Sequence, residues 1–293
     1  MWTQVEGSGR AGDIRNLVLL NDEHPGFHDR RYRARRDEIA RIALAYQEGE
    51  AVPHAPYTEA EHGVWHSVNQ LLSPLHQQRV CRELRDANAH FPLDPFRIPQ
   101  LSAVNAQLKN ATGFRMEPVM GLVRARTFLS ALGREVFLST QYIRHHSRPL
   151  YTPEPDIVHE LVGHAASLAH PRLAEVNACI GRAVDSADDS EVLRLERVYW
   201  YSLEFGLVEE EGSIKALGAG LLSSAGELEQ IESGPELRSW DLDAIAETPY
   251  DPTDMQPQLY VAPSFGRLIG DIEDWVESGG WKRKSSPVAV AIY

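Results

Sequence analysis

Cysteine is scarce in this chain of 293 residues, which contains Cys81 and Cys179 and no other. Two thiols are too few for the disulfide framework of a small secreted domain, so a reducing, cytoplasmic setting is expected. No apolar run reaches the roughly 18 residues that a membrane-spanning helix needs. The first twelve residues also lack the basic and apolar regions of a signal peptide. The sequence therefore predicts neither a secreted, disulfide-linked fold nor a membrane protein.

Positive charge is in the minority. Lys and Arg together number 29 against 42 Asp and Glu, which gives a formal net charge of -13. An acidic surface is repelled by nucleic acids and by anionic membranes, so neither is expected as a partner. Hydrophobic residues make up 43% of the chain, which is enough to bury a full core. These features indicate an ordinary globular protein whose partner is a small molecule.

Strand patterns are few and short, at Glu135–Ser139, Ser213–Leu217 and Leu259–Ala262. Helical spacing of apolar residues dominates the rest, for example over Asp29–Tyr46. Thr58 and Glu61 are interpreted as a capping box that opens a helix. The apolar face of that helix contains Val64, Trp65, Val68 and Leu72, and a further helix is indicated by Leu101, Val104 and Leu108. The expected fold class is mostly α with small β elements (α+β), and not an alternating parallel α/β fold.

Linker-like composition is absent between Asp22 and Leu268. The simplest partition is one catalytic domain over residues 21–278. Residues 1–20 are then expected to form an N-terminal arm. Residues 279–293, which contain Gly-Gly, Lys-Arg-Lys and Ser-Ser-Pro, are expected to form a C-terminal tail.

The segment YTPEPDIVHELVGH, residues 151–164, carries His159 and His164 among apolar neighbours. Thr152, Pro153, Pro155 and Asp156 are typical of a helix start. Zinc peptidases place two histidines four residues apart, whereas these are five apart and would lie ~140° apart on a regular helix. A shared metal therefore needs an irregular turn such as a π-bulge, which Gly163 would ease. Two hydrogen-bonded core histidines are the alternative interpretation.

Glu204 lies in VYWYSLEFGLV, residues 198–208, which is interpreted as a helix. A carboxylate surrounded by apolar and aromatic groups is costly unless it is paired or binds a cation. It is therefore either a partner of a buried arginine such as Arg144 or a metal ligand. Two imidazoles and one carboxylate form the facial triad of iron(II) oxygenases. The same set also serves zinc hydrolases, so ligand identity alone leaves both metals open.

Two further segments are candidates for ligand binding. Arg144, in TQYIRHHSRP, follows a strand-like run, and its guanidinium suits a substrate carboxylate. A surface arginine is the simpler alternative, and a structural pair with a buried acid such as Asp156 is a further one. GAGLLSSAGE, residues 218–227, lacks the lysine and spacing of a P-loop. Its glycines and serines allow close approach of the backbone to a ligand, or form an ordinary helix-capping turn.

These segments together resemble the pterin-dependent aromatic amino acid hydroxylases. The resemblance spans Asp22 to Leu268, and its strongest blocks are GFRMEPVMGLV, TQYIRHHSRPLYTPEPDIVHELVGH, YWYSLEFGL, IKALGAGLLSSAGELE and QPQLYVAPSF. It implies the family's catalytic-domain fold, a mostly helical basket around a mononuclear iron site. The implied cofactors are Fe(II) and tetrahydrobiopterin or a related tetrahydropterin, with O2 as co-substrate.

The resemblance assigns roles residue by residue. The implied metal ligands are His159, His164 and Glu204, and the catalytic set adds Glu160. The residues implied on the pterin side are Gly121, Val123, Phe128, Glu160 and Tyr199. Those implied to bind the amino acid are Arg144, Thr152, Trp200, Phe205, Gly220 and Ser223. The chain departs from the animal enzymes on the pterin and substrate sides, at Arg124, Ala125, Leu138 and Glu196.

The resemblance also implies a stand-alone catalytic domain of the bacterial type, expected as a monomer or weak dimer. Its expected reaction is hydroxylation of L-phenylalanine to L-tyrosine, because Trp200 favours a one-ring substrate. Hydroxylation of phenylalanine at the meta carbon is the second choice, and tryptophan hydroxylation is the third. From other classes, a zinc hydrolase and a non-catalytic protein that binds pterin or amino acid stay as alternatives.

Overall fold

Helices dominate the computed structural model, which describes residues 20, 22, 24–150, 152, 154–252 and 255–282. The α-helices are α1 (Arg30–Ala45), α2 (Glu59–Arg79), α3 (Arg82–His90), α4 (Leu101–Ala111), α5 (Ala125–Leu132), α6 (Ala166–Leu168), α7 (Pro171–Val184), α8 (Asp189–Tyr199), α9 (Ala219–Leu222), α10 (Ala225–Gln230), α11 (Leu242–Glu247) and α12 (Phe265–Glu277). Two π-helices, η1 (His159–Ala165) and η2 (Trp200–Glu204), interrupt this series. The expected α+β class with small sheets is confirmed.

The strands form two small sheets in the described part of the chain. β1 (Arg115–Pro118) pairs in parallel with β2 (Val136–Ser139). The second sheet has the order β4-β3-β6-β5 and contains β3 (Leu207–Glu210), β4 (Ser213–Ala216), β5 (Glu236–Ser239) and β6 (Gln258–Ala262). The sequence patterns predicted β2, β4 and β6 but not the other three. Strands of four residues carry too little alternation to stand out, and they form because distant segments pair with them.

Local signals set the helix starts that the sequence analysis predicted. The Asp29 carboxylate accepts the backbone N–H groups of Arg31 and Tyr32 at the start of α1. The capping box of Thr58 and Glu61 is present at the start of α2. The apolar positions predicted for α2 and α4 are all buried, namely Val64, Trp65, Val68, Leu72, Leu101, Val104 and Leu108. Each of these helices therefore follows from capping chemistry and apolar spacing.

The helix predicted over residues 198–208 is wrong at its end. The helical path stops at Glu204, and Leu207 begins strand β3. Glycine is needed at Gly206, where the chain turns, because a Cβ there would lie 2.1 Å from the backbone oxygen of Ser202. The residues that follow pair in the sheet, where Leu207 is aligned with Ala216 of β4 on one side and with Val261 of β6 on the other. Tertiary pairing thus overrides a local pattern that also suited a helix.

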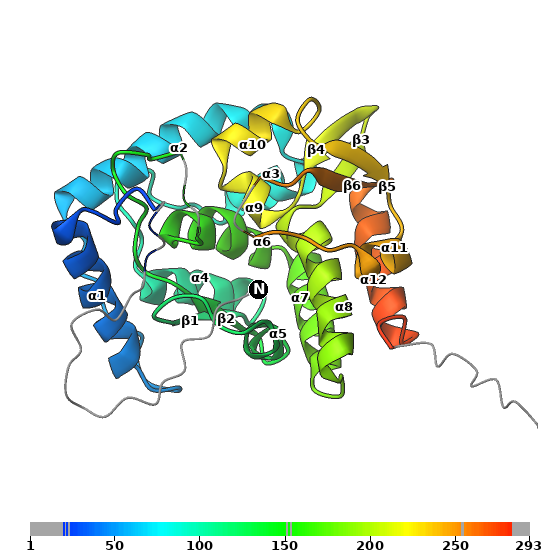
Figure 1. Cartoon of the computed structure of the whole chain (residues 1–293), viewed down its shortest axis with the longest axis horizontal. Coiled ribbons are helices and arrows are strands. Elements are labelled where there is room, and N and C mark those ends of the chain that lie inside the picture. The colour runs from blue at the N-terminus through cyan, green and yellow to red at the C-terminus, as the bar shows by residue number, and fades with distance from the viewer. Residues whose placement is uncertain are drawn as a thin grey trace, which may run out of the picture.

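The elements surround a central helical segment made of η1 and α6. In Figure 1, α6 lies near the middle, with α2 above it, α7 and α8 to its right, and β1, β2, α4 and α5 below. Two close backbone approaches hold this arrangement. A Cβ on Gly163 of η1 would lie 2.6 Å from the Ala219 oxygen of α9, and one on Gly181 of α7 would lie 2.1 Å from the Gly133 nitrogen. Glycine at these two positions therefore lets neighbouring elements pack at backbone distance.

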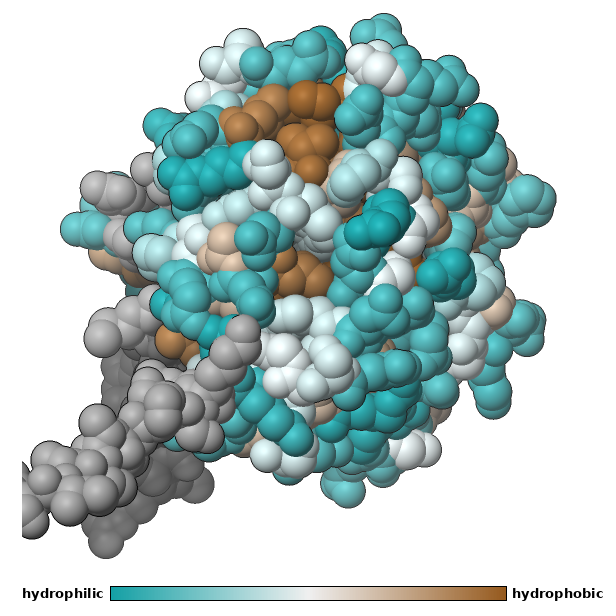
Figure 2. All heavy atoms as spheres, turned by 90° about the vertical axis from the view of Figure 1, so that its right-hand side faces the viewer, coloured by the Kyte–Doolittle hydropathy of each residue, from teal (hydrophilic) through white to brown (hydrophobic). Residues whose placement is uncertain are grey.

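Polar residues cover most of the face of the molecule shown in Figure 2. The hydrophobic patches on this face are small and separate. In the described part of the chain, no helix combines the length and apolarity needed to cross a bilayer. The predicted arm lies outside the described residues except for Leu20. Of the predicted tail, Gly279 to Lys282 are described; Trp281 is buried there, and the rest lies outside.

Candidate active site

A single cavity of about 540 Å³ gathers the residues that the sequence analysis singled out. They come from segments spread over a hundred positions of the chain. The cavity is lined by every one of them, namely Gly121, Val123, Phe128, Arg144, Thr152, His159, Glu160, His164, Tyr199, Trp200, Glu204, Phe205, Gly220 and Ser223. The fold therefore brings the predicted metal, pterin and substrate positions to one place.

The two histidines lie on the π-helix η1, the irregular turn that their spacing required. A π-helix closes its hydrogen bonds between residues five apart, so His159 and His164 come onto one face. The cap of this segment is Asp156, whose carboxylate accepts the His159 N–H at 3.2 Å. Thr152 does not cap it, since its hydroxyl donates to the Glu154 oxygen instead. Pro153 lies outside the described residues.

The three predicted ligands converge with their donor atoms facing one another. The Nε2 atoms of His159 and His164 are 2.9 Å apart. Oε1 of Glu204 lies 3.2 Å from the first, and Oε2 lies 3.0 Å from the second. Ligands bound at ~2.1 Å to one metal ion are about 3.0 Å apart in an octahedral site and about 3.4 Å apart in a tetrahedral one. The observed spacings of 2.9 to 3.2 Å therefore bring the three side chains within reach of one divalent metal ion.

The protonation of His159 suits a metal ligand. Burial lowers the pKa of His159 to about 4, so its ring is neutral at pH 7. Its Nδ1 lies 3.0 Å from the Ser223 hydroxyl, whose own proton points to the Ala219 or Gly220 oxygen. Nδ1 is therefore the donor, and the lone pair of Nε2 is directed at Glu204. The sequence analysis placed Ser223 in the pocket wall and missed this contact with His159.

Glu160 is held beside the metal ligands by Thr140. The backbone N–H and the hydroxyl of Thr140 donate to Oε1 of Glu160 at 2.9 Å and 2.8 Å. Burial nevertheless dominates and raises the pKa of Glu160 to about 7. The site thus contains a carboxyl group able to exchange a proton near neutral pH, at the wall of the cavity.

Aromatic rings form the wall between the predicted pterin positions and the ligands. Phe128 meets Tyr199 and Phe137 edge to face, at centroid distances of 5.5 Å and 5.3 Å. Phe137 in turn packs 4.5 Å from the ring of His164. The buried hydroxyl of Tyr199 has no hydrogen-bond partner among the described residues. A polar cofactor in this cavity would satisfy that hydroxyl, so the wall fits a flat, polar aromatic ring such as a pterin.

Trp200 is the most constrained member of the predicted substrate wall. Its indole N–H donates to Oε1 of Gln256 at 2.9 Å, and its ring stacks on Tyr250 at 4.2 Å. The ring of Phe205 packs against that of Trp200 at a centroid distance of 4.8 Å. A Cβ on Gly220 would lie 2.7 Å from the Phe205 ring, so glycine is needed for this contact. The apolar wall is therefore rigid.

Arg144 is buried and paired, which excludes the surface-arginine alternative. Its Nε and Nη2 donate to the two carboxylate oxygens of Asp156 at 2.9 Å and 2.8 Å. Burial alone would raise the pKa of Asp156, but the Arg144 guanidinium outweighs it and holds that pKa below its ordinary value. The alternative pairing of Arg144 with Glu204 is wrong, because Glu204 faces the two histidines. Arg144 still reaches the cavity wall.

Two lining residues, Glu227 and Tyr250, escaped the sequence analysis. Burial raises the pKa of Glu227 to about 7. The Tyr250 hydroxyl donates to Glu196, the position already noted as a departure on the pterin side. Nothing in the local pattern of either residue separates it from an ordinary surface glutamate or core tyrosine. Glu227 lies on α10 and Tyr250 on the loop before β6, and both face the cavity because of where the fold places these two elements.

Comparison with known proteins agrees with this site. The family model described as biopterin-dependent aromatic amino acid hydroxylase matches residues 16–284. Tyrosine 3-monooxygenase of Mus musculus is 44% identical over 251 residues, covering 84% of this chain and 50% of that protein. Phenylalanine-4-hydroxylase of Caenorhabditis elegans is 41% identical over 264 residues, covering 87% and 57%. The chain thus spans about half the length of the curated relatives that it matches.

A solved structure supports the same relationship. Phenylalanine hydroxylase of Chromobacterium violaceum with bound iron(III) and 7,8-dihydrobiopterin superposes with a TM-score of 0.71 at 26% identity, covering 85% of this chain and 96% of that one. The expected family, and with it the expected iron and pterin cofactors, is confirmed. On the cavity geometry and these matches, the chain belongs to the biopterin-dependent aromatic amino acid hydroxylases.

Proposed function

We propose that the chain is an iron(II)- and tetrahydropterin-dependent monooxygenase that converts L-phenylalanine to L-tyrosine. One observation carries the proposal. A single cavity combines the two histidines and one glutamate with two walls: an aromatic wall, in which the Tyr199 hydroxyl has no hydrogen-bond partner among the described residues, and the apolar wall formed by Trp200 and Phe205. When bound, iron and the pterin supply the activation of dioxygen. The protein's own part is to bind, to orient and to exclude water.

His159, His164 and Glu204 are the proposed ligands of the iron. Their donor atoms converge at the wall of the cavity, so an iron ion held there would be within reach of oxygen and of a substrate ring. Ser223 positions His159 through Nδ1. Glu160, beside the ligands and hydrogen-bonded to Thr140, is proposed to hold a proton near the pterin.

The amino acid is proposed to lie between Arg144 and the apolar wall. Asp156 occupies the Nε and Nη2 side of the guanidinium, and among the described residues Nη1 makes one contact, of 3.3 Å, with the Pro149 oxygen. The Nη1 side is therefore the one proposed to receive the substrate carboxylate, with Thr152 beside it. A ring held by Trp200 and Phe205 would then lie in the same cavity as the proposed metal ligands.

Phe128 is proposed to stack on the pterin, together with backbone contacts at Gly121 and Val123. Replacing Phe128 with Ala should raise the pterin concentration for half-maximal rate about 2- to 13-fold, because aromatic stacking contributes roughly 0.5–1.5 kcal/mol. Iron content should not change, since Phe128 contacts the ligand His164 only through Phe137 and Tyr199. Steady-state kinetics with varied pterin measures the effect.

Phe96 provides the matched control for this substitution, because it is 63% exposed and lies outside the cavity. Phe96→Ala should leave the pterin dependence unchanged. If Phe128 is only a core residue, Phe128→Ala will unfold more readily and show no selective change in pterin dependence. That outcome would remove the stacking role.

Product identification tests the reaction itself. The iron-loaded protein is incubated with a tetrahydropterin, oxygen and each of phenylalanine, tyrosine and tryptophan, and products are assigned by mass spectrometry and NMR. We expect para-hydroxylation of phenylalanine to dominate. A meta-hydroxylated product would keep the enzyme class and change the regiochemistry. Absence of pterin-dependent oxygen uptake with all three amino acids would contradict the monooxygenase proposal.

Tyrosine is the second candidate substrate, because tyrosine 3-monooxygenases are among the relatives at 44% identity. The same experiment separates the two candidates. This alternative would be favoured if the protein converted tyrosine to 3,4-dihydroxyphenylalanine faster than it converted phenylalanine to tyrosine. A Glu204→Gln variant serves as the negative control for both, since it keeps the shape of the side chain and removes its charge.

A further inference from the structure

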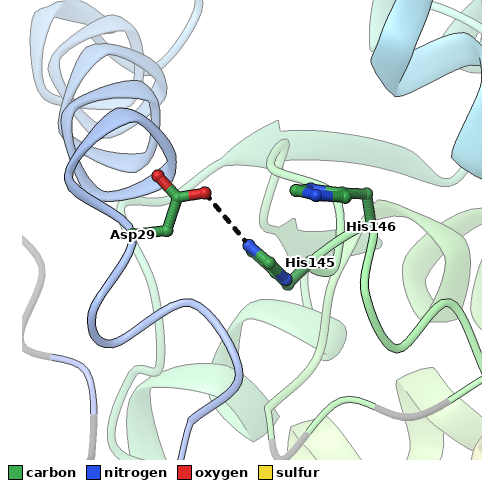
Figure 3. Close-up of side chains that lie close together, drawn as sticks. All are labelled: Asp29, His145 and His146. Atoms are coloured by element: carbon green, nitrogen blue, oxygen red, sulfur yellow. Dashed lines mark hydrogen bonds and ion pairs between the residues drawn. The ribbon is translucent and has the colours of Figure 1, made fainter.

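A second group of metal-ligating side chains lies outside the cavity. Asp29, His145 and His146 place one ligand atom each within 4.8 Å of one another. Figure 3 shows the carboxylate of Asp29, at the start of α1, facing the ring of His145, with the ring of His146 beside it. None of the three lines the cavity. The cluster is therefore separate from the proposed iron site.

The hydrogen bonds of His145 define which of its nitrogens faces Asp29. The Ser147 N–H donates to Nδ1 of His145 at 3.2 Å, so Nδ1 is the acceptor and Nε2 carries the proton. Nε2 lies 3.3 Å from Oδ2 of Asp29, which is longer than an ordinary N–H···O hydrogen bond of 2.7–3.2 Å. Oδ1 of Asp29 already accepts the first N–H groups of α1, so Oδ2 is the oxygen left for another partner.

The 3.3 Å separation is also close to the ~3.4 Å between two ligands bound at ~2.1 Å to a tetrahedral zinc ion. Binding at Nε2 would move the ring proton of His145 from Nε2 to Nδ1, which would then donate to the Ser147 hydroxyl at 2.7 Å. His146 is exposed, so its ring can turn to supply the third ligand, and water would complete the tetrahedron. The partial positive charge at the start of α1 opposes a cation, but the Asp29 carboxylate lies between that helix end and the site.

We propose that Asp29, His145 and His146 bind a zinc(II) ion at the protein surface. Two imidazoles and one carboxylate select a borderline-soft transition metal over calcium or magnesium, which prefer oxygen ligands. The ion would connect the start of α1 to the segment that follows Arg144. Because the ion binds the folded protein, zinc would raise the melting temperature.

Zinc titration of the iron-loaded protein tests this site without using activity. Metal analysis after desalting should give one iron and one additional zinc per chain. His146→Ala should weaken zinc binding about tenfold or more, because even an outer-shell partner of a metal is worth 10- to 100-fold. Zinc should raise the melting temperature of the wild type by on the order of 5 °C, and that of His146→Ala by much less.

His54→Ala is the matched control, because His54 is also exposed and belongs to no ligand cluster found among the described residues. It should bind zinc as the wild type does. Equal zinc affinity in wild type and His146→Ala would overturn the proposal, as would one-for-one displacement of iron with no second equivalent bound. His146 contacts no residue of the proposed iron site, so either result leaves the proposed hydroxylase function untouched.

Discussion

Replacing His164 with Ala is expected to strip iron from the protein and to abolish pterin-dependent hydroxylation. His164 supplies one corner of a triangle whose sides are 2.9 to 3.2 Å, and no other described residue offers a ligand atom to this group. The loss in metal affinity should exceed the 10- to 100-fold that removal of an outer-shell partner costs. Metal analysis after anaerobic reconstitution, followed by oxygen uptake, measures both losses.

Ser223→Ala gives a graded comparison for this prediction. It removes the partner of His159 Nδ1 while keeping all three ligands, so iron affinity should fall by about 10- to 100-fold and be recovered with excess iron. Circular dichroism should show that both variants stay folded. Full activity in His164→Ala would refute the ligand assignment, and equal losses in the two variants would point to misfolding.

Replacing Arg144 with Ala is expected to have two large effects. The first is on stability: Asp156 is fully buried, and removing its partner leaves an uncompensated charge that typically costs about 3–5 kcal/mol of unfolding free energy. The second is on binding: losing a charge-assisted contact to the substrate carboxylate should cost about 1.5–3 kcal/mol, or one to two orders of magnitude in amino acid affinity. Chemical denaturation and amino acid titration measure the two effects separately.

Asp156→Asn separates the structural role from the clamp, because it removes the charge of Asp156 and keeps the guanidinium of Arg144. Arg144→Lys should restore neither effect fully, since a point charge cannot reproduce the two parallel hydrogen bonds to Asp156. A test on the wild-type protein needs no substitution, so its result does not depend on any change in stability. Phenylalanine amide, which lacks the carboxylate charge, should bind much more weakly than phenylalanine, and equal binding of the two would rule out the clamp.

Several features followed from the sequence alone because their causes are local. The capping groups Asp29 and Thr58 fix where α1 and α2 begin, and apolar spacing along α2 and α4 decides which side chains are buried. The five-residue spacing of His159 and His164 required an irregular helix, and the π-helix η1 provides it. The family motifs, in turn, picked out a set of residues that all line one cavity.

Other features were decided only by tertiary structure, because they depend on residues distant in the chain. The end of the helix at Glu204 is set by sheet partners at Ala216 and Val261 and not by the segment's own pattern. The sequence allowed Arg144 to lie at the surface, to pair with Glu204 or to pair with a buried acid such as Asp156, and only the fold showed that the Asp156 pair forms.

The contact of Ser223 with His159, and the turn of Glu227 towards the cavity, likewise required the folded chain. A side chain's hydrogen-bond partners and burial are set by elements that approach through space, and those distances have no counterpart in local sequence. The sequence by itself therefore determined which residue types were available for the chemistry, and the packing of α9 against both η1 and η2 decided how they meet.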